Sequence, residues 1–141
     1  MIVLDTNVVS EVMRPAPEPR VIGWLDQHRP VDLYLTTLTL AELRYGLAAL
    51  PQGRRQAALV TSFEQDLLPL YEGRILTFDE PASRAYARLK AAARAAGQPR
   101  PDLDLMIASI CAAHGFSLAT RNVDDFAGTG IEVIDPWTET A

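Results

Sequence analysis

The sequence contains few of the residues that build disulfides or zinc sites, with one cysteine and two histidines among 141 residues. A single cysteine cannot form an intramolecular disulfide, which excludes a disulfide scaffold and favours a reducing, cytoplasmic environment. His28 and His114 fall near predicted helix ends, so with Cys111 they do not have the spacing of a zinc site. We expect Cys111, which lies in an apolar segment, to be a small core residue.

Long apolar runs and glycine-rich loops are also missing. No apolar run approaches the ~18 residues that a membrane-spanning helix needs, and the N-terminus lacks the basic region of a secretory signal. Gly23, Gly46 and Gly53 are too scattered to form a phosphate-binding loop. We therefore expect neither a membrane protein, nor an exported one, nor a P-loop enzyme.

The net charge is −5, and twelve of the thirteen basic residues are arginine. An acidic protein is a poor nonspecific binder of nucleic acid, because neutralisation of phosphates supplies most of that affinity. Clustered carboxylates can nevertheless bind a cation and reverse the sign of the local field. With 48% apolar and 22% charged residues, the chain has enough core material for one domain spanning residues 1–141.

Short apolar segments alternate with helical patterns along the chain. Strands are predicted at residues 1–4, 34–37, 74–78, 116–120 and 131–134. Helices are predicted at 6–13, 20–28, 39–50, 54–70, 80–96 and 102–114, with a short helix or turn at 122–126. Because no tight hairpin joins two strands, the pattern predicts an α/β three-layer sandwich, in which helices flank a mostly parallel sheet of about five strands.

Polar residues at the predicted helix starts have the character of caps. Asp5 directly follows the first strand and can cap the first helix. Thr39 and Glu42 have the spacing of a capping box, which predicts that the third helix begins at Thr39. Asp102, directly after Pro101, is predicted to cap the helix that follows it.

Acidic side chains follow several of the predicted strands. Asp5 follows the first strand, and Glu42 lies one turn into the helix after the second. Asn122 and Asp125 follow the fourth strand, and Asp104 lies in the first turn of a strongly apolar helix. In a parallel sheet such positions meet at the carboxyl edge, where ligands bind. Carboxylates packed this closely repel one another unless a divalent cation lies between them, so a Mg²⁺ or Mn²⁺ site is predicted.

Most of these residues also have a purely structural explanation. Asp5 can be only a cap, and Glu42 only the second half of a capping box. Asn122 and Asp125 can form another capping pair. Asp104 is the exception, because its neighbours in the sequence are apolar and a charge among them needs a partner.

Four short motifs occur in an order and spacing that resemble one known family. They are 2–7 (IVLDTN), 41–46 (AELRYG), 104–108 (DLMIA) and 120–126 (TRNVDDF). Together they resemble the PIN domain, and more narrowly the VapC-type toxins of bacterial toxin–antitoxin pairs. Segments 20–26, 73–81 and 135–137 are most similar to the FitB subgroup, so the resemblance covers nearly the whole chain.

The resemblance implies a metal-dependent endoribonuclease that hydrolyses RNA phosphodiester bonds with Mg²⁺ or Mn²⁺ as cofactor. The family's first three acids correspond to Asp5, Glu42 and Asp104. Asp125 matches a further acid of many VapC sequences, while Asn122 stands where some relatives carry aspartate and can still ligate a cation through its amide oxygen. We expect Asp5 and Asp104 to hold the principal ion and Glu42 to orient or deprotonate the attacking water. Asn122 and Asp125 are expected to complete the catalytic metal site, with Asp125 acting through water.

Supporting residues and partners follow from the same resemblance. Thr6 and Thr120 match small polar positions whose hydroxyls can hold the carboxylates in place. Arg121 beside the site and Arg44 on the third helix are candidates for contact with RNA phosphates. The expected partners are an RNA substrate such as transfer RNA, a VapB- or FitA-type antitoxin and a second copy of the chain in a homodimer.

The predicted helical hairpin at 39–70 has more apolar residues than one small domain needs for its core. Tyr45 and Phe63 on this hairpin, together with Trp24, are therefore either core residues or contacts for a partner. Core packing is the simpler explanation for each of them.

Two other function classes remain open. A Mg²⁺-dependent phosphotransferase or phosphatase of the haloacid-dehalogenase or receiver type would also place an aspartate after the first strand. Such proteins need a lysine at a strand end, whereas the one lysine here, Lys90, lies inside a predicted helix. Asn7 stands where a dehalogenase has its second aspartate. A catalytically silent regulatory binding module is the second alternative, which the presence of Asp5, Glu42 and Asp104 disfavours.

Overall fold

Five short strands form one parallel sheet in the computed structural model, which describes residues 1–139. The strands are β1 (Ile2–Leu4), β2 (Leu33–Thr36), β3 (Ile75–Leu76), β4 (Ser117–Ala119) and β5 (Val133–Ile134). Their order is β3-β2-β1-β4-β5, and every neighbouring pair is parallel. Parallel neighbours require crossover connections, which the intervening helices supply.

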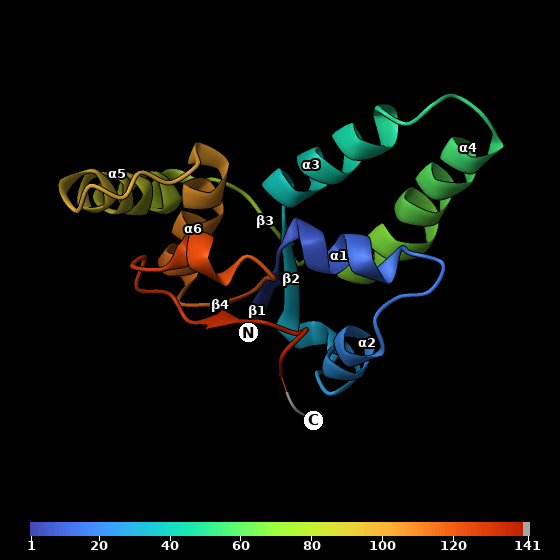
Figure 1. Ribbon diagram of the computed structural model, residues 1–141, viewed down its shortest axis with the longest axis horizontal. Coiled ribbons are helices and arrows are strands. Elements are labelled where there is room, and N and C mark those ends of the chain that lie inside the picture. Colours follow the sequence, from blue (N-terminus) through green and yellow to red (C-terminus); the bar gives the residue numbers. More distant parts are fainter. Residues whose placement is uncertain (140–141) are drawn as a thin grey trace.

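The helical elements alternate with these strands, as Figure 1 shows. They are α1 (Thr6–Val12), α2 (Pro19–Asp26), η1 (Pro30–Asp32), α3 (Thr37–Ala48), α4 (Arg54–Thr61), η2 (Ser62–Leu67), η3 (Leu68–Tyr71), α5 (Glu80–Ala95), α6 (Asp102–His114) and η4 (Val123–Phe126). Within residues 1–139, no helix has the length and apolar composition of a membrane span. The predicted three-layer α/β sandwich with a parallel sheet is confirmed.

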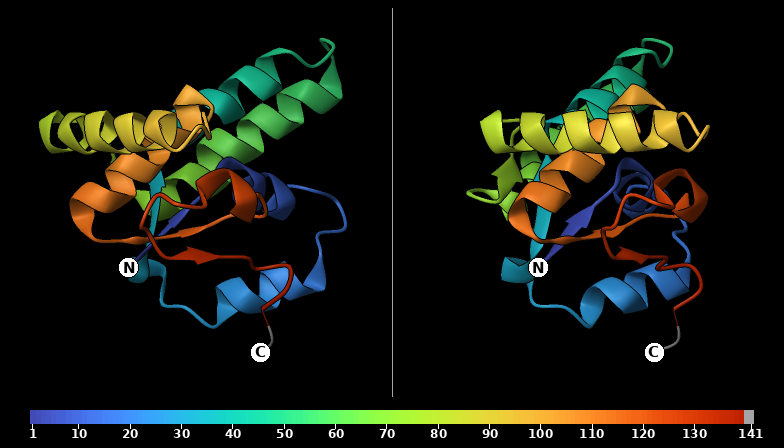
Figure 2. Two further views of the ribbon diagram at one scale, coloured as in Figure 1. Left: turned by 60° about the vertical axis from the view of Figure 1, so that its left-hand side comes forward. Right: turned by 90° about the vertical axis from the view of Figure 1, so that its left-hand side faces the viewer.

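Alternating side chains of the central strand define the two faces of the sheet. Ile2 and Leu4 pack into a core with residues of α1, α2 and α3, whereas Val3 packs into a second core with residues of α6. In Figure 1, α5 and α6 accordingly lie on the other side of the strands from α1 and α2. The α3–α4 hairpin extends beyond the sheet in both views of Figure 2.

The register of the sheet sets which residues emerge together at its carboxyl edge. Leu4 pairs with Ala119, and the backbone N–H of Asp5 donates to the carbonyl of Ala119 at 2.9 Å. Residues 5 and 120 therefore leave adjacent strands side by side. On the other side of β1, Val3 pairs with Tyr34, so β2 ends at the same edge.

Two of the predicted helix starts are wrong. Helix α3 begins at Thr37, two residues before the expected start at Thr39, and its cap is Thr36, whose hydroxyl accepts from the Thr39 N–H at 3.1 Å. The end of β2 is fixed by pairing with its neighbours, so the helix starts as soon as the strand stops. The side chain of Glu42 is therefore not needed for capping.

Helix α6 has Pro101 as its N-cap rather than Asp102, which is the first helical residue. The Asp102 carboxylate instead accepts from Lys90 Nζ at 2.9 Å and from the Tyr86 hydroxyl at 3.0 Å, both on α5. Asp5, in contrast, caps α1 as predicted, because its Oδ1 accepts from the Thr6 N–H at 2.8 Å.

The second helix of the hairpin, predicted at 54–70, is helical over this range but is not a regular α-helix throughout. After α4 the chain forms one π-helical segment and then a 3₁₀ turn, so the helical backbone reaches Tyr71. Phe63 in the π-helical segment and Trp24 on α2 are core residues, whereas Tyr45 on α3 is 76% exposed. Of the three aromatic candidates, only Tyr45 is available to a partner.

Candidate active site

Asp5 is the most deeply buried acid at the carboxyl edge of the sheet, with an exposed fraction of 5%. Both of its carboxylate oxygens accept hydrogen bonds: Oδ1 from the Thr6 N–H, and Oδ2 from the Thr120 hydroxyl at 2.8 Å. Asn7 Nδ2 lies 3.4 Å from the same Oδ2. These donors fix the orientation of a carboxylate that would otherwise be costly to bury.

The pKa of Asp5 is raised above its ordinary value, mainly because the group is buried. The hydrogen bonds from Thr120 and Thr6 lower this pKa, while the charges of Glu42 and Asp125 raise it further. The negative charges of two acids that are distant in the sequence thus act on Asp5. The predicted convergence of carboxylates is reflected in its electrostatics.

Asp104, in the first turn of α6, faces the same group of acids. Its pKa is raised from 3.8 to about 6, mainly by burial and then by the charges of Asp5, Asp125 and Glu42. Electrostatic repulsion of this kind requires that the four carboxylates share one region of the molecule. A divalent cation placed among them would remove the repulsion.

Glu42 reaches the site from the first turns of α3. Its Oε1 accepts a hydrogen bond of 2.6 Å from the Thr6 hydroxyl, so α1 and α3 are joined at the site. A hypothetical Cβ on Gly46, one turn further along α3, would meet no atom within 4 Å. The Oε1 atom of Glu42 is therefore fixed by a hydrogen bond, and there is open space beside Gly46, one turn further along the helix.

Asn122 and Asp125 lie at the 3₁₀ turn that follows β4. Asn122 occupies the cap position of η4, yet its side chain makes no capping hydrogen bond. Its backbone N–H donates to the Thr120 hydroxyl at 3.1 Å, and the N–H of Asp125 donates to the Asn122 carbonyl at 3.1 Å. The amide of Asn122 is thus not used as a side-chain cap.

One open pocket of about 460 Å³ joins these residues. Its lining includes Asp5, Glu42, Asp104 and Asn122, together with Arg121 and Trp137. Asp125 is outside the lining and acts on the site through its charge. The structure therefore brings Asp5, Glu42 and Asp104 to the pocket wall together with Asn122, and it leaves the fourth predicted acid, Asp125, outside the lining.

The chemistry of these donors fits a hard divalent cation. Carboxylate and amide oxygens are the ligands that Mg²⁺ prefers, and the mutual repulsion of four acids is the condition that such an ion relieves. Within residues 1–139, no three His, Cys, Asp or Glu side chains already lie close enough together to hold an ion. Asp5, Glu42 and Asp104 share one pocket, and the charge of Asp125 also acts on Asp104.

Asn7 is a site residue to which the sequence pattern assigned no role. Its Nδ2 donates to the Thr120 hydroxyl at 3.1 Å, and its Oδ1 accepts from the backbone N–H of Arg121 at 3.1 Å. Asn7 thus connects the turn after β1 with the turn after β4. Its position two residues after Asp5 is the sequence feature that could have identified it as a site residue.

The two arginines proposed as RNA contacts differ in their surroundings. Arg44 forms an ion pair with Glu64, with N–O distances of 2.8 and 3.1 Å, and is not in the lining of the acidic pocket. Arg121 lines that pocket, and its guanidinium carbon lies 5.0 Å from the ring centroid of Trp137. Trp137 is a second site residue that sequence reasoning did not identify.

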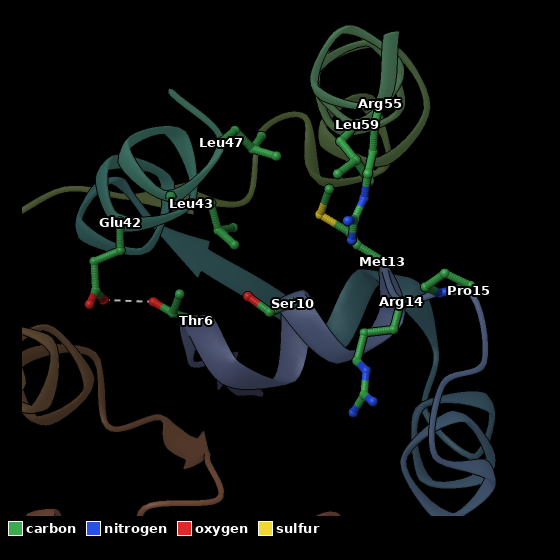
Figure 3. A pocket seen from close by; sticks show the side chains of 11 residues that line it. Thr6, Ser10, Met13, Arg14, Pro15, Glu42, Leu43, Leu47, Arg55 and Leu59 are labelled. Atoms are coloured by element: carbon green, nitrogen blue, oxygen red, sulfur yellow. Dashed lines mark hydrogen bonds between the residues drawn. The ribbon is translucent and has the colours of Figure 1, made fainter. Parts of the chain in front are cut away.

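A second, more apolar pocket of about 280 Å³ adjoins the site between α1 and the α3–α4 hairpin. Figure 3 shows Thr6 and Glu42, joined by their hydrogen bond, at one end of it. The rest of the lining comprises Ser10, Met13, Arg14, Pro15, Leu43, Gly46, Leu47, Arg55 and Leu59. An apolar groove with two arginines thus leads to the Glu42 carboxylate.

Comparison with known proteins gives consistent matches over this architecture. The family model described as PIN domain matches residues 2–131. VapC ribonuclease Y4jK from Sinorhizobium fredii is 44% identical over 137 residues, covering 97% of this chain and 98% of that protein. Toxin FitB from Neisseria gonorrhoeae is 42% identical over 137 residues, covering 97% and 99%. The crystal structure of FitAcB from Neisseria gonorrhoeae matches with a TM-score of 0.94 at 42% identity, over 99% of this chain and 100% of that chain.

Proposed function

The chain belongs to the PIN-domain family, and from this premise we propose that it is a Mg²⁺- or Mn²⁺-dependent endoribonuclease, the toxin of a type II toxin–antitoxin pair. The observation that carries the proposal is the pocket at the carboxyl edge of the sheet that Asp5, Glu42 and Asp104 line together. Burial and the charges of Asp5, Asp125 and Glu42 raise the pKa of Asp104 there. A ribonuclease and a toxin among the relatives agree with the proposal.

Asp5 and Asp104 are the residues that would hold the principal ion. Asp5 is oriented for this by Thr6 and Thr120, and Asp104 gains a counterion for a charge that its apolar helix disfavours. The Asn122 amide completes the donor set at the pocket wall, and Asp125, outside the lining, adds negative charge to the site. A bound divalent ion supplies charge neutralisation for the phosphoryl oxygens and for the leaving oxygen.

Glu42 is the residue we assign to the attacking water. The Thr6 hydroxyl fixes its Oε1, so the remaining carboxylate oxygen can accept a hydrogen bond from water and then its proton. Because water is the nucleophile, the ribose 2′-hydroxyl is not required. An RNA with a 2′-deoxy substitution at the scissile nucleotide should still be cut, and complete resistance of a well-bound substrate would contradict this mechanism.

The apolar pocket beside Glu42 suits a short segment of an antitoxin of the VapB or FitA type. It has an apolar wall from α1, α3 and α4 and ends at the catalytic carboxylate, so a bound segment would also obstruct the acidic pocket. A homodimer is part of the same proposal, and exposed Tyr45 on the hairpin is one candidate contact.

The two alternative functions are less well supported by the structure. Lys90, the only lysine, lies on α5 and is paired with Asp102, so it cannot serve a phosphotransferase site beside Asp5. A silent binding module would have no need for Asp104 to be held against three other acids.

One assay distinguishes the three functions. Purified protein freed of any antitoxin is incubated with total RNA and Mg²⁺ or Mn²⁺, alongside an EDTA control, an Asp5→Asn variant and an Asp124→Asn variant. Asp124 is an exposed acid next to Asp125, so Asp124→Asn is the matched control. Metal-dependent fragments with the wild type and the control, and none with Asp5→Asn, support the ribonuclease. A stable phosphoaspartate, or no reaction at all, would contradict it.

A further inference from the structure

Arg121 and Trp137 form a stacked pair at the wall of the acidic pocket. The guanidinium carbon of Arg121 lies 5.0 Å from the Trp137 ring centroid, within the range of a cation–π interaction. Both residues line the same pocket as Asp5 and Asp104. A flat cation therefore stands beside the carboxylates of an otherwise acidic protein.

Trp137 is held in place from three directions. The Trp137 ring packs against the core formed by β1, α1 and α2. The backbone N–H of Trp137 donates to Asp135 Oδ1 at 2.9 Å. Its carbonyl accepts from Arg20 NH1 at 3.3 Å. The backbone of Arg121 is itself fixed by the hydrogen bond to Asn7 Oδ1. The stacked pair is therefore positioned before any ligand arrives, which lowers the entropic cost of binding.

The other arginine in the lining of the acidic pocket, Arg14, already has a carboxylate partner. Arg44 stacks on Phe63 at 5.9 Å but is paired with Glu64, and Arg14 is paired with the buried Glu11 at 3.2 Å. Across residues 1–139, Arg121 has no ion pair. Its edge N–H groups are thus available for an anionic ligand, while its face is occupied by the indole.

We propose that Arg121 and Trp137 form a docking subsite for a phosphodiester of single-stranded RNA, next to the one that is cut. This inference rests on the proposed ribonuclease function and names the feature that contacts its substrate. Trp137 holds the guanidinium flat, and Arg121 donates two parallel hydrogen bonds to the phosphate oxygens. The subsite gives an acidic protein a fixed cation beside the site of hydrolysis.

The test measures RNA binding separately from cleavage. A short fluorescein-labelled oligouridylate is titrated with protein in CaCl₂, with intact RNA verified on a gel, and the fluorescence anisotropy is followed at several NaCl concentrations. Arg121→Ala should raise Kd about tenfold, and the slope of log K against log salt should fall by about 0.7, the value for one phosphate contact on a single strand. Arg84→Ala, which removes an exposed arginine of α5 that is ion-paired with Glu80, should change neither quantity.

Variants of Trp137 test whether it acts through Arg121. Trp137→Leu should raise Kd about threefold, Trp137→Phe should restore most of the affinity, and Trp137→Leu should have no further effect in the Arg121→Ala background. Thermal unfolding of each variant shows whether the fold is retained. An unchanged salt slope for Arg121→Ala, or full additivity of the two substitutions, would overturn the subsite.

Cleavage in Mg²⁺ distinguishes failure of the subsite from failure of the proposed function. If the wild type cuts RNA and both variants keep its KM, the ribonuclease stands and the subsite is wrong. If the wild type binds RNA with the predicted dependence on Arg121 and Trp137 but never cuts it, the subsite stands and the enzymatic function is wrong. For a correct proposal, the variants should raise KM with kcat within about twofold of the wild type.

Discussion

The Thr120 hydroxyl donates a 2.8 Å hydrogen bond to Asp5 Oδ2, and both residues lie one position beyond a paired residue of two neighbouring strands. The same hydroxyl oxygen accepts from Asn7 Nδ2 and from the Asn122 N–H, each at 3.1 Å. Thr120 is completely buried. One hydroxyl group thus links the central acid of the site to the turn that carries Asn122 and Asp125.

Replacing Thr120 with valine should therefore weaken metal binding more than serine does. Valine fills the same volume but leaves one buried oxygen of Asp5 without its main donor, and the pKa of Asp5, which this hydrogen bond lowers, should rise further. We expect a ten- to hundredfold weaker Kd for Mn²⁺, about the cost of losing such a supporting group. The free energy of unfolding should fall by about 1–3 kcal/mol.

Isothermal titration with Mn²⁺ and urea unfolding measure the two effects for Thr120→Val and Thr120→Ser. The serine variant keeps the hydroxyl and is the matched control. Mn²⁺ affinity equal to that of the wild type in Thr120→Val would show that Asp5 does not need this donor to bind the ion.

Asp104 should make the stability of the metal-free protein depend on pH. Its pKa is raised in the folded state from 3.8 to about 6, mainly by burial and then by the charges of Asp5, Asp125 and Glu42. A raised carboxyl pKa gives stability that is fully present below the unfolded value of 3.8 and is lost as the pH rises through about 6. In EDTA, Tm should therefore fall across this range, and Mg²⁺ should reverse the loss.

Asp104→Asn removes the charge and should flatten this pH dependence. Near neutral pH in EDTA, the variant should have a higher Tm than the wild type, yet Mg²⁺ should no longer raise it. Asp124→Asn, at an exposed acid of the same edge, should behave as the wild type does. A wild-type Tm in EDTA that stays constant between about pH 4 and pH 7 would contradict the assignment.

The sequence was sufficient for the fold because its local signals agree with the tertiary structure. Apolar segments of three or four residues, each followed by a helical pattern, can only be arranged as a parallel sheet with crossovers. Asp5 was identified as both a cap and a site residue, and the structure gives it both positions at once. The carboxyl-edge rule then selected Glu42 and Asp104, which share its pocket.

The incorrect predictions occur where distant contacts override a local pattern. Thr39 and Glu42 have the spacing of a capping box, but pairing of β2 ends the strand at Thr36, whose own hydroxyl caps the helix. Asp102 directly follows a proline, as a capping residue can, but its carboxylate accepts a hydrogen bond from Lys90 on α5 and does not cap α6. The spacing of residues in one helix cannot report such partners.

Trp137 could not have been placed at the site from the sequence. Its contacts with Arg20 and Arg121 join segments that only the fold brings together. The pairing of Arg44 with Glu64 is similarly invisible until the hairpin is formed. Long-range partners of exposed arginines depend on tertiary geometry. The sequence alone therefore could not show that, among residues 1–139, Arg44 is ion-paired while Arg121 is not.

Arg100 should control the mobility of the turn that carries Asp125. Its NH1 and NH2 groups donate to the carbonyls of Asp124 at 2.8 Å and Ala127 at 3.0 Å, on either side of Asp125. Arg100→Ala removes both hydrogen bonds, so the amides of Asp125 and Ala127 should exchange with solvent about tenfold faster, which corresponds to one hydrogen bond's net stability.

Hydrogen exchange followed by NMR measures this effect, with the amides of Ile107 and Ile110 in the buried part of α6 as internal references. Arg100→Lys should restore little, because a single ammonium cannot bridge two carbonyls as the planar guanidinium does. Arg94→Ala on exposed α5 is the control. Equal exchange rates in Arg100→Ala and the wild type would mean that η4 is held by its own hydrogen bonds.

Phe63 and Tyr45 are the two aromatic residues of the hairpin, and only truncation of Phe63 should lower the stability of the isolated chain substantially. Phe63 is completely buried, so Phe63→Ala should lower the free energy of unfolding by about 3–5 kcal/mol. Tyr45 is 76% exposed, so Tyr45→Ala should change it by no more than about 0.5 kcal/mol. Urea unfolding at low protein concentration measures both. If Tyr45→Ala is destabilising only at high concentration, the exposed face of α3 is buried by a second copy; if it is neutral at every concentration, the homodimer must use a different surface.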